Sequence, residues 1–329
     1  MSEKVLITGA SGFVGYHLIE AALNEGLTVH AAVRKSSDVS HLKDFDIKFV
    51  DLDYSSVDAL KKQLESEQYQ YIIHAAGITK AKNLDTYNKV NAEYSRNLAL
   101  AANSAELNLK KFVFVSSLAA LGPLSDLTGE ITDDVTGKPV TSYGTSKLLA
   151  EQYLKNIPGL PLIIIRPTAV YGPREKDIFI LFKSISRGLE PHIGSFKQQL
   201  SFIYVKDLAR LIIQALRAEV SGMQYNISDG RVYDRYVLAQ LTKKAMNKRT
   251  LKLHLPIGIV AGLAALMEMV YKRSANTPTL NKEKMAELTA VNWACNIERA
   301  RKDLNFNPQF DLENGLLETV KWYKENNWL

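Results

Sequence analysis

A tyrosine and a lysine four residues apart carry the most reactive chemistry in this sequence. Tyr143 and Lys147 stand in Tyr-Gly-Thr-Ser-Lys, at the start of a predicted helix over 143–156. Residues four apart lie on one face of a helix, so we expect the ammonium to lie near the phenol. A nearby positive charge favours the phenolate and lowers the tyrosine pKa, which suits a general acid or base. Alone, this spacing is common on surface helices.

Two serine hydroxyls follow a predicted strand at 112–115. Parallel α/β sheets bind ligands at the carboxyl ends of their strands, and Ser116 and Ser117 stand at such an end. We interpret Ser116 as a turn-capping residue. Ser117, taken together with the tyrosine and lysine, is a candidate hydrogen-bond partner for a substrate carbonyl or hydroxyl.

Three glycines mark a turn near the start of the chain, in Thr-Gly-Ala-Ser-Gly-Phe-Val-Gly over 8–15. The turn follows a strand-like run at 5–7 and opens a helix predicted over 13–24. Glycine lets the backbone approach a pyrophosphate, and a helix start offers free N–H groups and a positive dipole end. An ordinary glycine-rich turn is the alternative, but the position between strand and helix favours a dinucleotide site. The residues assigned to it are Gly9, Ser11, Gly12, Phe13, Val14 and Gly15.

The end of the second predicted strand, at 29–33, indicates which dinucleotide binds. An acidic residue there would accept hydrogen bonds from the ribose of NAD(H). Instead Arg34 and Lys35 offer cations, and Ser36 a hydroxyl, to a 2′-phosphate. We therefore predict NADP(H), with a solvated basic loop as the alternative.

Two later strand ends complete the predicted crevice. Asp51 and Leu52 follow the third strand, where a carboxylate and an apolar side chain can flank adenine. The fourth strand ends in small residues that let the backbone pass close to a cofactor. His74, which precedes them, we interpret as a packed histidine. The small residues are Ala75, Ala76 and Gly77.

Short apolar runs alternate with helical stretches in the first half of the chain. Such runs are typical of parallel strands covered by helices on both faces. The predicted fold is α/β, a doubly wound parallel (Rossmann) sheet, with a smaller, mostly helical C-terminal substrate domain from Tyr233 onward. We place the nucleotide-binding domain at 1–170, with 200–228 returning to it, and the substrate domain at 171–199 and 229–329.

Composition narrows the function classes. The chain has 329 residues, 46% hydrophobic and 23% charged, as in a globular protein. The single cysteine, Cys295, excludes an internal disulfide and a cysteine-based metal cluster, and we expect no metal. The net charge of +6 is spread along the chain, so we expect no nucleic-acid partner.

One apolar segment, 257–271, bears on location. It is too short to span a bilayer, and we expect no secretory signal and a cytoplasmic protein. Lys272 and Arg273 flank the segment. The segment is therefore predicted to be one of two things. It is either an amphipathic helix in a membrane interface, which would give peripheral membrane association, or a core helix.

Taken together, the motifs resemble those of the extended short-chain dehydrogenases/reductases. The resemblance rests on TGASGFVG at 8–15, HAAG at 74–77, FVFVSSLAALG at 112–122, YGTSK at 143–147 and RPTAVYGP at 166–173. HLPI at 254–257, NIERARKDLNFNP at 296–308 and TVKWY at 319–323 look like the 3β-hydroxysteroid dehydrogenase and dihydroflavonol reductase branch.

This resemblance implies roles for particular residues. It assigns catalysis to Ser117, Tyr143 and Lys147, with Lys147 also binding the nicotinamide ribose and Asn91 positioning a water for proton relay. A homodimer through the helices at 87–108 and 143–156 is a further expectation. The residues expected to border the nicotinamide are Pro167, Ala169 and Val170.

The resulting hypothesis is an NADP(H)-dependent oxidoreductase that interconverts a ketone and a secondary alcohol on an apolar, sterol- or sphingoid-like substrate. Leu118 and Ala119 stand where a sugar-nucleotide 4,6-dehydratase needs an Asp-Glu pair, which excludes that reaction. A sugar-nucleotide 4-epimerase with tightly bound NAD stays open. So does a non-catalytic NADP sensor, although such proteins typically lose the tyrosine or lysine.

Overall fold

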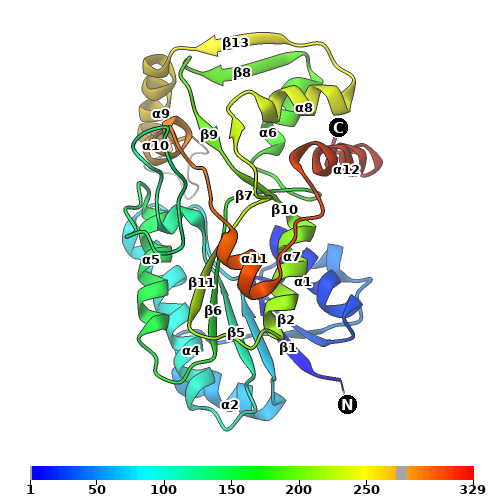
Figure 1. The fold of residues 1–329 in the computed structure, drawn as a ribbon. Coiled ribbons are helices and arrows are strands. Elements are labelled where there is room, and N and C mark those ends of the chain that lie inside the picture. The colour runs from blue at the N-terminus through cyan, green and yellow to red at the C-terminus, as the bar shows by residue number, and fades with distance from the viewer. Residues whose placement is uncertain (1, 272–279) are drawn as a thin grey trace.

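The computed structural model describes residues 2–271 and 280–329. A seven-stranded sheet in the order β11-β6-β5-β4-β1-β2-β3 occupies the lower half of Figure 1, with every neighbouring pair parallel. The chain moves outward from β1 to β3 and then crosses back to β4, as in a doubly wound fold. The predicted fold class is confirmed. The strands are β1 (Lys4–Thr8), β2 (Thr28–Ala32), β3 (Lys48–Val50), β4 (Tyr71–His74), β5 (Lys111–Val115), β6 (Leu162–Pro167) and β11 (Met223–Ile227).

Helices cover both faces of the sheet and create two hydrophobic cores. In β1, Val5 and Ile7 belong to the core under α1, α7 and α11, whereas Leu6 between them belongs to the core under α2, α4 and α5. Alternate residues of a strand point to opposite faces, so an unbroken apolar run serves both cores. The covering helices are α1 (Phe13–Asn24), α7 (Val205–Leu216), α11 (Glu298–Leu304), α2 (Val57–Glu67), α4 (Tyr94–Ser104) and α5 (Ser142–Lys155).

Above the carboxyl edge of the sheet lies what we call the cap region, formed by α6, α8, α9, α10, α12, β8 and β13 (Figure 1). The prediction of a mostly helical chain after Tyr233 is confirmed, although the short strands β12 and β13 also occur there. β13 pairs in parallel with β8, and two shorter pairs, β7 with β10 and β9 with β12, join the cap region to the sheet. Their bounds are β7 (Ala169–Tyr171), β8 (Leu189–Ile193), β9 (Gln199–Leu200), β10 (Phe202–Tyr204), β12 (Tyr233–Asp234) and β13 (Leu251–Leu255).

The helices of the cap region divide into two packing groups. α6 (Phe179–Ser186), α8 (Val237–Met246) and α12 (Leu312–Glu325) share an aromatic-rich core. α9 (Ile257–Tyr271) packs instead with α10 (Lys282–Thr289) in a small separate cluster. The core interpretation of α9 is wrong, because Val260 and Ala264 are its buried residues and most of its surface is exposed.

The flanking Lys272 and Arg273 lie outside the described residues. Within 2–271 and 280–329, no helix combines the length and the apolar character that crossing a bilayer requires.

Candidate active site

A cavity of about 920 Å³ runs along the carboxyl edge of the sheet. Its wall includes the turn after β1, the ends of β2 to β6 and the first residues of α5. Parallel sheets place such ligand sites at this edge because all their strand ends meet there. The structure thereby brings together most of the predicted site residues: Gly9, Ser11, Gly12, Phe13, Val14, Gly15, Arg34, Asp51, Leu52, Ala75, Ala76, Gly77, Ser117, Tyr143, Lys147, Pro167 and Val170.

The glycine turn fits a dinucleotide pyrophosphate. Gly9 has φ +68°, and a Cβ there would lie 2.6 Å from the carbonyl oxygen of Ala75. A Cβ on Gly15 would lie 2.2 Å from the carbonyl oxygen of Gly9. Helix α1 begins after Gly12 with no side-chain cap and no acidic residue in its first turn. Its first N–H groups and its positive dipole end therefore suit a bound phosphate.

Four predicted residues, Lys35, Ser36, Ala169 and Asn91, do not line the cavity. The Lys35 side chain is 91% exposed and reaches Asp51 at 3.8 Å, and Ser36 is also exposed. Ala169 is exposed as well, while Thr168 and Val170 on either side of it line the cavity. Ala169 begins β7, and side chains alternate along a strand, so Ala169 and Val170 face opposite ways.

Several cavity residues had no recognisable pattern in the sequence. His41 stacks on Tyr16, with ring centroids 6.1 Å apart, and Arg174 places its guanidinium 4.0 Å above the same ring. Burial and the nearby charges of Arg174 and Lys176 lower the pKa of His41. Arg34, Arg174 and Lys176 line the cavity together with the carboxylates of Asp38, Asp51, Glu175 and Asp177.

Ser117 and Tyr143 both line the cavity and are joined by a side-chain hydrogen bond. Ser117 follows β5, and its Oγ accepts a hydrogen bond from the Ala119 backbone N–H at 3.2 Å. Tyr143 is the second residue of α5, which is capped by Thr141. Burial raises the Tyr143 pKa to about 12, opposed by a hydrogen bond with Ser117. The prediction of a lowered tyrosine pKa is therefore wrong for this structure, because burial outweighs the favourable contacts.

Lys147 lies one helical turn beyond Tyr143, as predicted, but its contacts are with β5. Its Nζ donates a hydrogen bond to the Val115 carbonyl at 2.8 Å and lies 4.6 Å above the centre of the Phe114 ring. Burial lowers the Lys147 pKa to about 8, and the nearby Glu151 carboxylate opposes that shift. The Lys147 amine is therefore held at the cavity wall, and it loses its proton at a lower pH than an exposed lysine does.

Asn91 is fully buried behind the cavity in a π-helical turn, 88–93. Its Oδ1 accepts from the Ile78 N–H at 2.8 Å, and its Nδ2 donates to the Ile78 carbonyl at 3.0 Å and to Ser146 Oγ at 2.9 Å. A Cβ on Gly77 would lie 3.1 Å from Asn91 Oδ1. The amide thus fixes the loop after β4 against α5, and π-turns of this kind are frequent at functional sites.

His74 also helps to hold the loop after β4 in place. Its Nε2 lies 2.8 Å from Ser95 Oγ, whose own proton goes to the Asn91 carbonyl, so Nε2 is the donor. Its Nδ1 lies 2.7 Å from Thr8 Oγ1, which accepts from the Ala76 N–H at 3.0 Å. Burial, aided by the Lys147 charge, lowers the His74 pKa to about 3. This neutral histidine links the ends of β1 and β4 to α4.

A buried ion pair lies behind the serines. Arg166 donates from Nε and Nη2 to the two oxygens of Glu151, at 2.9 and 2.6 Å. Ser116 Oγ donates to the same carboxylate at 2.6 Å, and Arg166 also reaches the Asp133 carbonyl at 2.9 Å. Ser116 was predicted as a turn cap, and the structure corrects this to a link between β5 and α5. Glu151 is one turn beyond Lys147, so this pair anchors the helix that carries the reactive residues.

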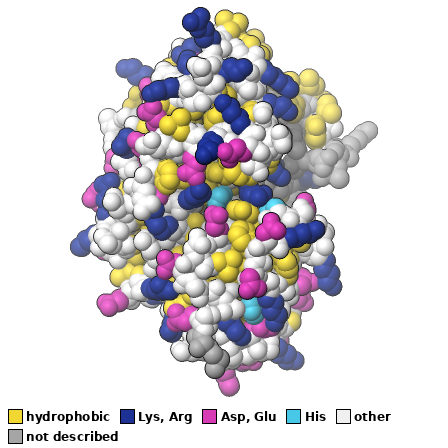
Figure 2. All heavy atoms as spheres, turned by 90° about the vertical axis from the view of Figure 1, so that its right-hand side faces the viewer, with side chains coloured by type: hydrophobic (Ala, Val, Ile, Leu, Met, Phe, Trp, Pro, Cys, Tyr) yellow, Lys and Arg dark blue, Asp and Glu magenta, His cyan; other side chains and the backbone are white. Residues whose placement is uncertain are grey.

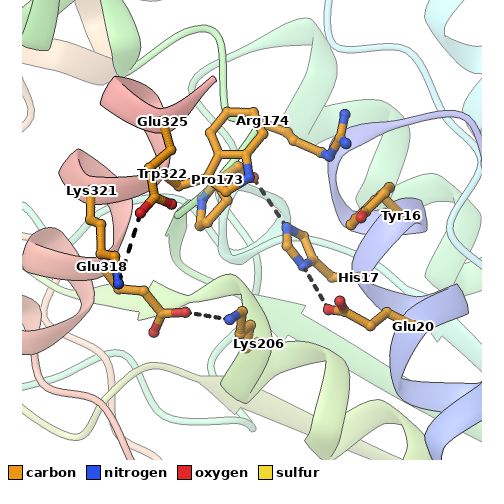
Figure 3. Close-up of a pocket in the computed structure, with 10 residues that line it drawn as sticks. All are labelled: Tyr16, His17, Glu20, Pro173, Arg174, Lys206, Glu318, Lys321, Trp322 and Glu325. Atoms are coloured by element: carbon orange, nitrogen blue, oxygen red, sulfur yellow. Dashed lines mark hydrogen bonds and ion pairs between the residues drawn. The ribbon is translucent and has the colours of Figure 1, made fainter. Parts of the chain in front are cut away.

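A smaller hollow of about 190 Å³ lies where α1 meets α12 (Figure 3). Several of its charged groups are matched within the hollow: His17 is near Glu20, and Lys206 is paired with Glu318 (Figure 3). Arg174 lines both this hollow and the main cavity. The hollow is thus a polar seam between helices.

Comparison with known proteins agrees with this geometry. The model of the NAD-dependent epimerase/dehydratase family matches residues 5–228. The chain is 28% identical to a ceramide reductase from Caulobacter vibrioides, an alignment that covers 99% of this chain and 96% of that protein. It is 25% identical to the decarboxylating sterol-4-alpha-carboxylate 3-dehydrogenase of Saccharomyces cerevisiae, over 98% of each.

Among solved structures, a UDP-glucose 4-epimerase from Thermotoga maritima superposes with a TM-score of 0.80 at 20% identity. It covers 98% of this chain and 99% of that one. At this identity the likeness concerns the fold.

Proposed function

Because this chain belongs to the NAD-dependent epimerase/dehydratase family of extended short-chain dehydrogenases/reductases, which are NAD(P)-dependent enzymes, we propose that it is an NADP(H)-dependent oxidoreductase. It interconverts a ketone and a secondary alcohol on an apolar, lipid-like substrate. The observation that carries this proposal is that Ser117, Tyr143 and Lys147 line the same cavity as the glycine turn.

In the direction of ketone reduction, the hydride would come from NADPH when it is held by the glycine turn and the strand ends. Tyr143 donates its phenolic proton to the carbonyl oxygen, which gains charge as the carbonyl is reduced, and Ser117 donates a second hydrogen bond to that oxygen. Burial raises the pKa of Tyr143 to about 12, so the phenol is protonated at neutral pH and can act as the donor.

Lys147 and Asn91 have supporting roles in the proposed reaction. Below its pKa of about 8 the Lys147 ammonium can bind the nicotinamide ribose and stabilise negative charge that develops on Tyr143. Asn91 does not line the cavity, so we assign it as a positioning residue that holds the loop after β4.

Two observations support NADP(H) and an apolar substrate. Arg34 lines the cavity at the end of β2, where an NAD enzyme would place an acid, and Arg174 and Lys176 add positive charge. The two relatives named above carry lipid substrates in their names, a ceramide and a sterol carboxylate. Both alignments extend through the C-terminal segments, in keeping with the 3β-hydroxysteroid dehydrogenase-like branch.

The decisive test is the Tyr143→Phe variant, assayed with NADPH and a ketone panel that includes a 3-keto sphingoid base and a 3-ketosteroid. We expect turnover to fall by roughly 10²- to 10⁴-fold, because the proton donor is lost. NADPH binding, measured by fluorescence titration, should be nearly unchanged. Tyr87→Phe is the matched control, since Tyr87 packs beside Tyr143 and donates only to the Thr79 carbonyl. Undiminished turnover in Tyr143→Phe would overturn the proposal.

Cofactor selectivity has its own test in Arg34→Asp. We expect this variant to weaken NADPH binding far more than NADH binding, because the 2′-phosphate loses a cation and meets a carboxylate. Protein that purifies with non-exchanging NAD and interconverts UDP-sugars would instead establish the epimerase alternative.

A further inference from the structure

Helix α9 presents an unusually apolar surface. Its inward stripe is formed by the buried Val260 and Ala264 and the half-buried Met267 and Tyr271, spaced as one face of a helix. The other positions are exposed, and all of them except Glu268 are apolar or glycine. Ile259 is 68% exposed and Met269 67%. An exposed apolar surface of this kind is typical of a site that contacts another protein or a membrane.

The strand before α9 extends this surface and adds charge. On β13, Leu251 is 62% exposed and Leu255 is also exposed, and Lys248 and Arg249, just before the strand, are exposed cations. Lysine and arginine side chains alternate with hydrophobic ones at the top of Figure 2, the end at which β8 and β13 lie in Figure 1.

Acidic groups are scarce along this surface. From 248 to 267 the sequence contains no Asp or Glu. The carboxylate of Glu268 is engaged, because it accepts a hydrogen bond from the Lys282 N–H at 2.8 Å.

We propose that α9 and the adjoining segment 248–255, together called the docking face, bind the surface of an anionic lipid bilayer. α9 lies in the interface with its apolar side among the acyl chains, and Lys248 and Arg249 contact lipid phosphates. Its 15 residues span roughly 22 Å, short of the roughly 30 Å hydrocarbon core, so the helix lies on the membrane rather than across it.

Charge argues against a second copy of the chain as the occupant. A two-fold interface brings the same surface of both copies together. The docking face would then set one cluster of cations against another, with Glu268 as its single carboxylate. Anionic lipid satisfies the hydrophobic and the electrostatic needs at once.

Helix α10 connects the docking face to α5, the helix that carries Tyr143. Val260 and Ala264 of α9 pack with Met285 of α10. Glu283, also on α10, accepts hydrogen bonds from the backbone N–H and the hydroxyl of Ser142, the first residue of α5, beside Tyr143. A bilayer held by α9 therefore lies next to the substrate side of the cavity, where a lipid could enter.

Vesicle co-sedimentation of the full chain tests the docking face without any need for turnover, so its result is separable from the proposed reaction. Vesicles contain phosphatidylcholine alone or mixed with phosphatidylglycerol. We expect binding to the mixed vesicles that weakens as salt is raised. Leu263→Glu with Leu266→Glu should abolish it, because both side chains are exposed on α9. Leu317→Glu, an exposed leucine of α12, is the matched control and should bind as the parent does.

A second double variant tests how much the positive charges contribute to membrane binding. Lys248→Gln with Arg249→Gln should lower partitioning into mixed vesicles roughly 10- to 30-fold, while circular dichroism stays unchanged. Absence of binding by the parent chain overturns the proposal, as does undiminished binding by the double glutamate variant. A parent that sediments as a dimer, and that the double glutamate variant converts to a monomer without any change in vesicle binding, also overturns it in favour of self-association.

Discussion

The sheet region and the cap region bury their apolar residues in different ways. In the sheet region the apolar strands are covered on both faces, and residues such as Leu6 and Ile7 are fully buried in opposite cores. In the cap region the most apolar helix, α9, leaves most of its side chains exposed. The same sequence property, a run of hydrophobic residues, thus marks internal packing in one place and an exposed helix face in the other.

Two ion pairs, one from each region, differ in the same way. The sheet region contains a dry ion pair, Arg166 with Glu151, whose side chains are 3% and 1% exposed. In the cap region Lys244 and Glu313 pair at 2.5 Å in the open, at 70% and 43% exposure. A buried charge is costly without its partner, whereas water replaces a lost surface partner.

Breaking these two ion pairs should produce the largest contrast in stability. Arg166→Met leaves the Glu151 carboxylate buried, and we expect it to cost roughly 3–5 kcal/mol of unfolding free energy. Lys244→Met should cost about 0–1 kcal/mol. Urea denaturation of both variants measures the difference. Equal losses would mean that the sheet region does not depend on its internal pair.

The sheet region could be predicted from sequence because its geometry restricts which residues can occupy it. Parallel strands buried on both faces require continuous apolar runs, and the turn after β1 requires glycine where a Cβ would meet backbone. The strands and the position of α1 were predicted for these reasons. The site residues on strand ends followed, because parallel strands end at one edge.

What escaped prediction depends on contacts between distant segments. The links from His74 to Thr8 and Ser95, and from Ser116 to Glu151, join elements that no local pattern connects. The Tyr143 pKa depends on burial, which the spacing of two residues does not reveal. β13 is different: Leu-Lys-Leu-His-Leu alternates as a strand should, and that signal was available in the sequence.

Replacing a glycine by alanine should have opposite effects on stability in the sheet region and in the cap region. Gly15→Ala in α1 should cost about 3 kcal/mol, because the new Cβ would lie 2.2 Å from the Gly9 carbonyl oxygen and 2.8 Å from Ala10 backbone atoms, which cannot move aside. Gly262→Ala in α9 meets nothing within 4 Å and should stabilise by about 0.5–1 kcal/mol. Thermal unfolding of the two variants should shift in opposite directions. A destabilising Gly262→Ala would show that α9 is packed more closely than its exposure indicates.

The smallest predicted effect concerns pH and is confined to the sheet region. Burial holds the Lys147 pKa at about 8, so the ammonium is present below pH 8 and is lost as the pH rises through that value. We expect NADPH affinity, measured by titration, to fall several-fold, up to roughly tenfold, between pH 7 and pH 9.

Lys147→Met separates this binding effect from stability. In that variant NADPH affinity should be weaker at pH 7 and lose its dependence near pH 8. Because the folded pKa lies below that of the unfolded chain, the charged lysine destabilises the fold below pH 8, and this cost is relieved as the pH rises above it. Removing the amine should therefore leave the protein at least as stable at pH 7. A parent whose NADPH affinity is flat across pH 8 would show that Lys147 is not the cation that holds the cofactor.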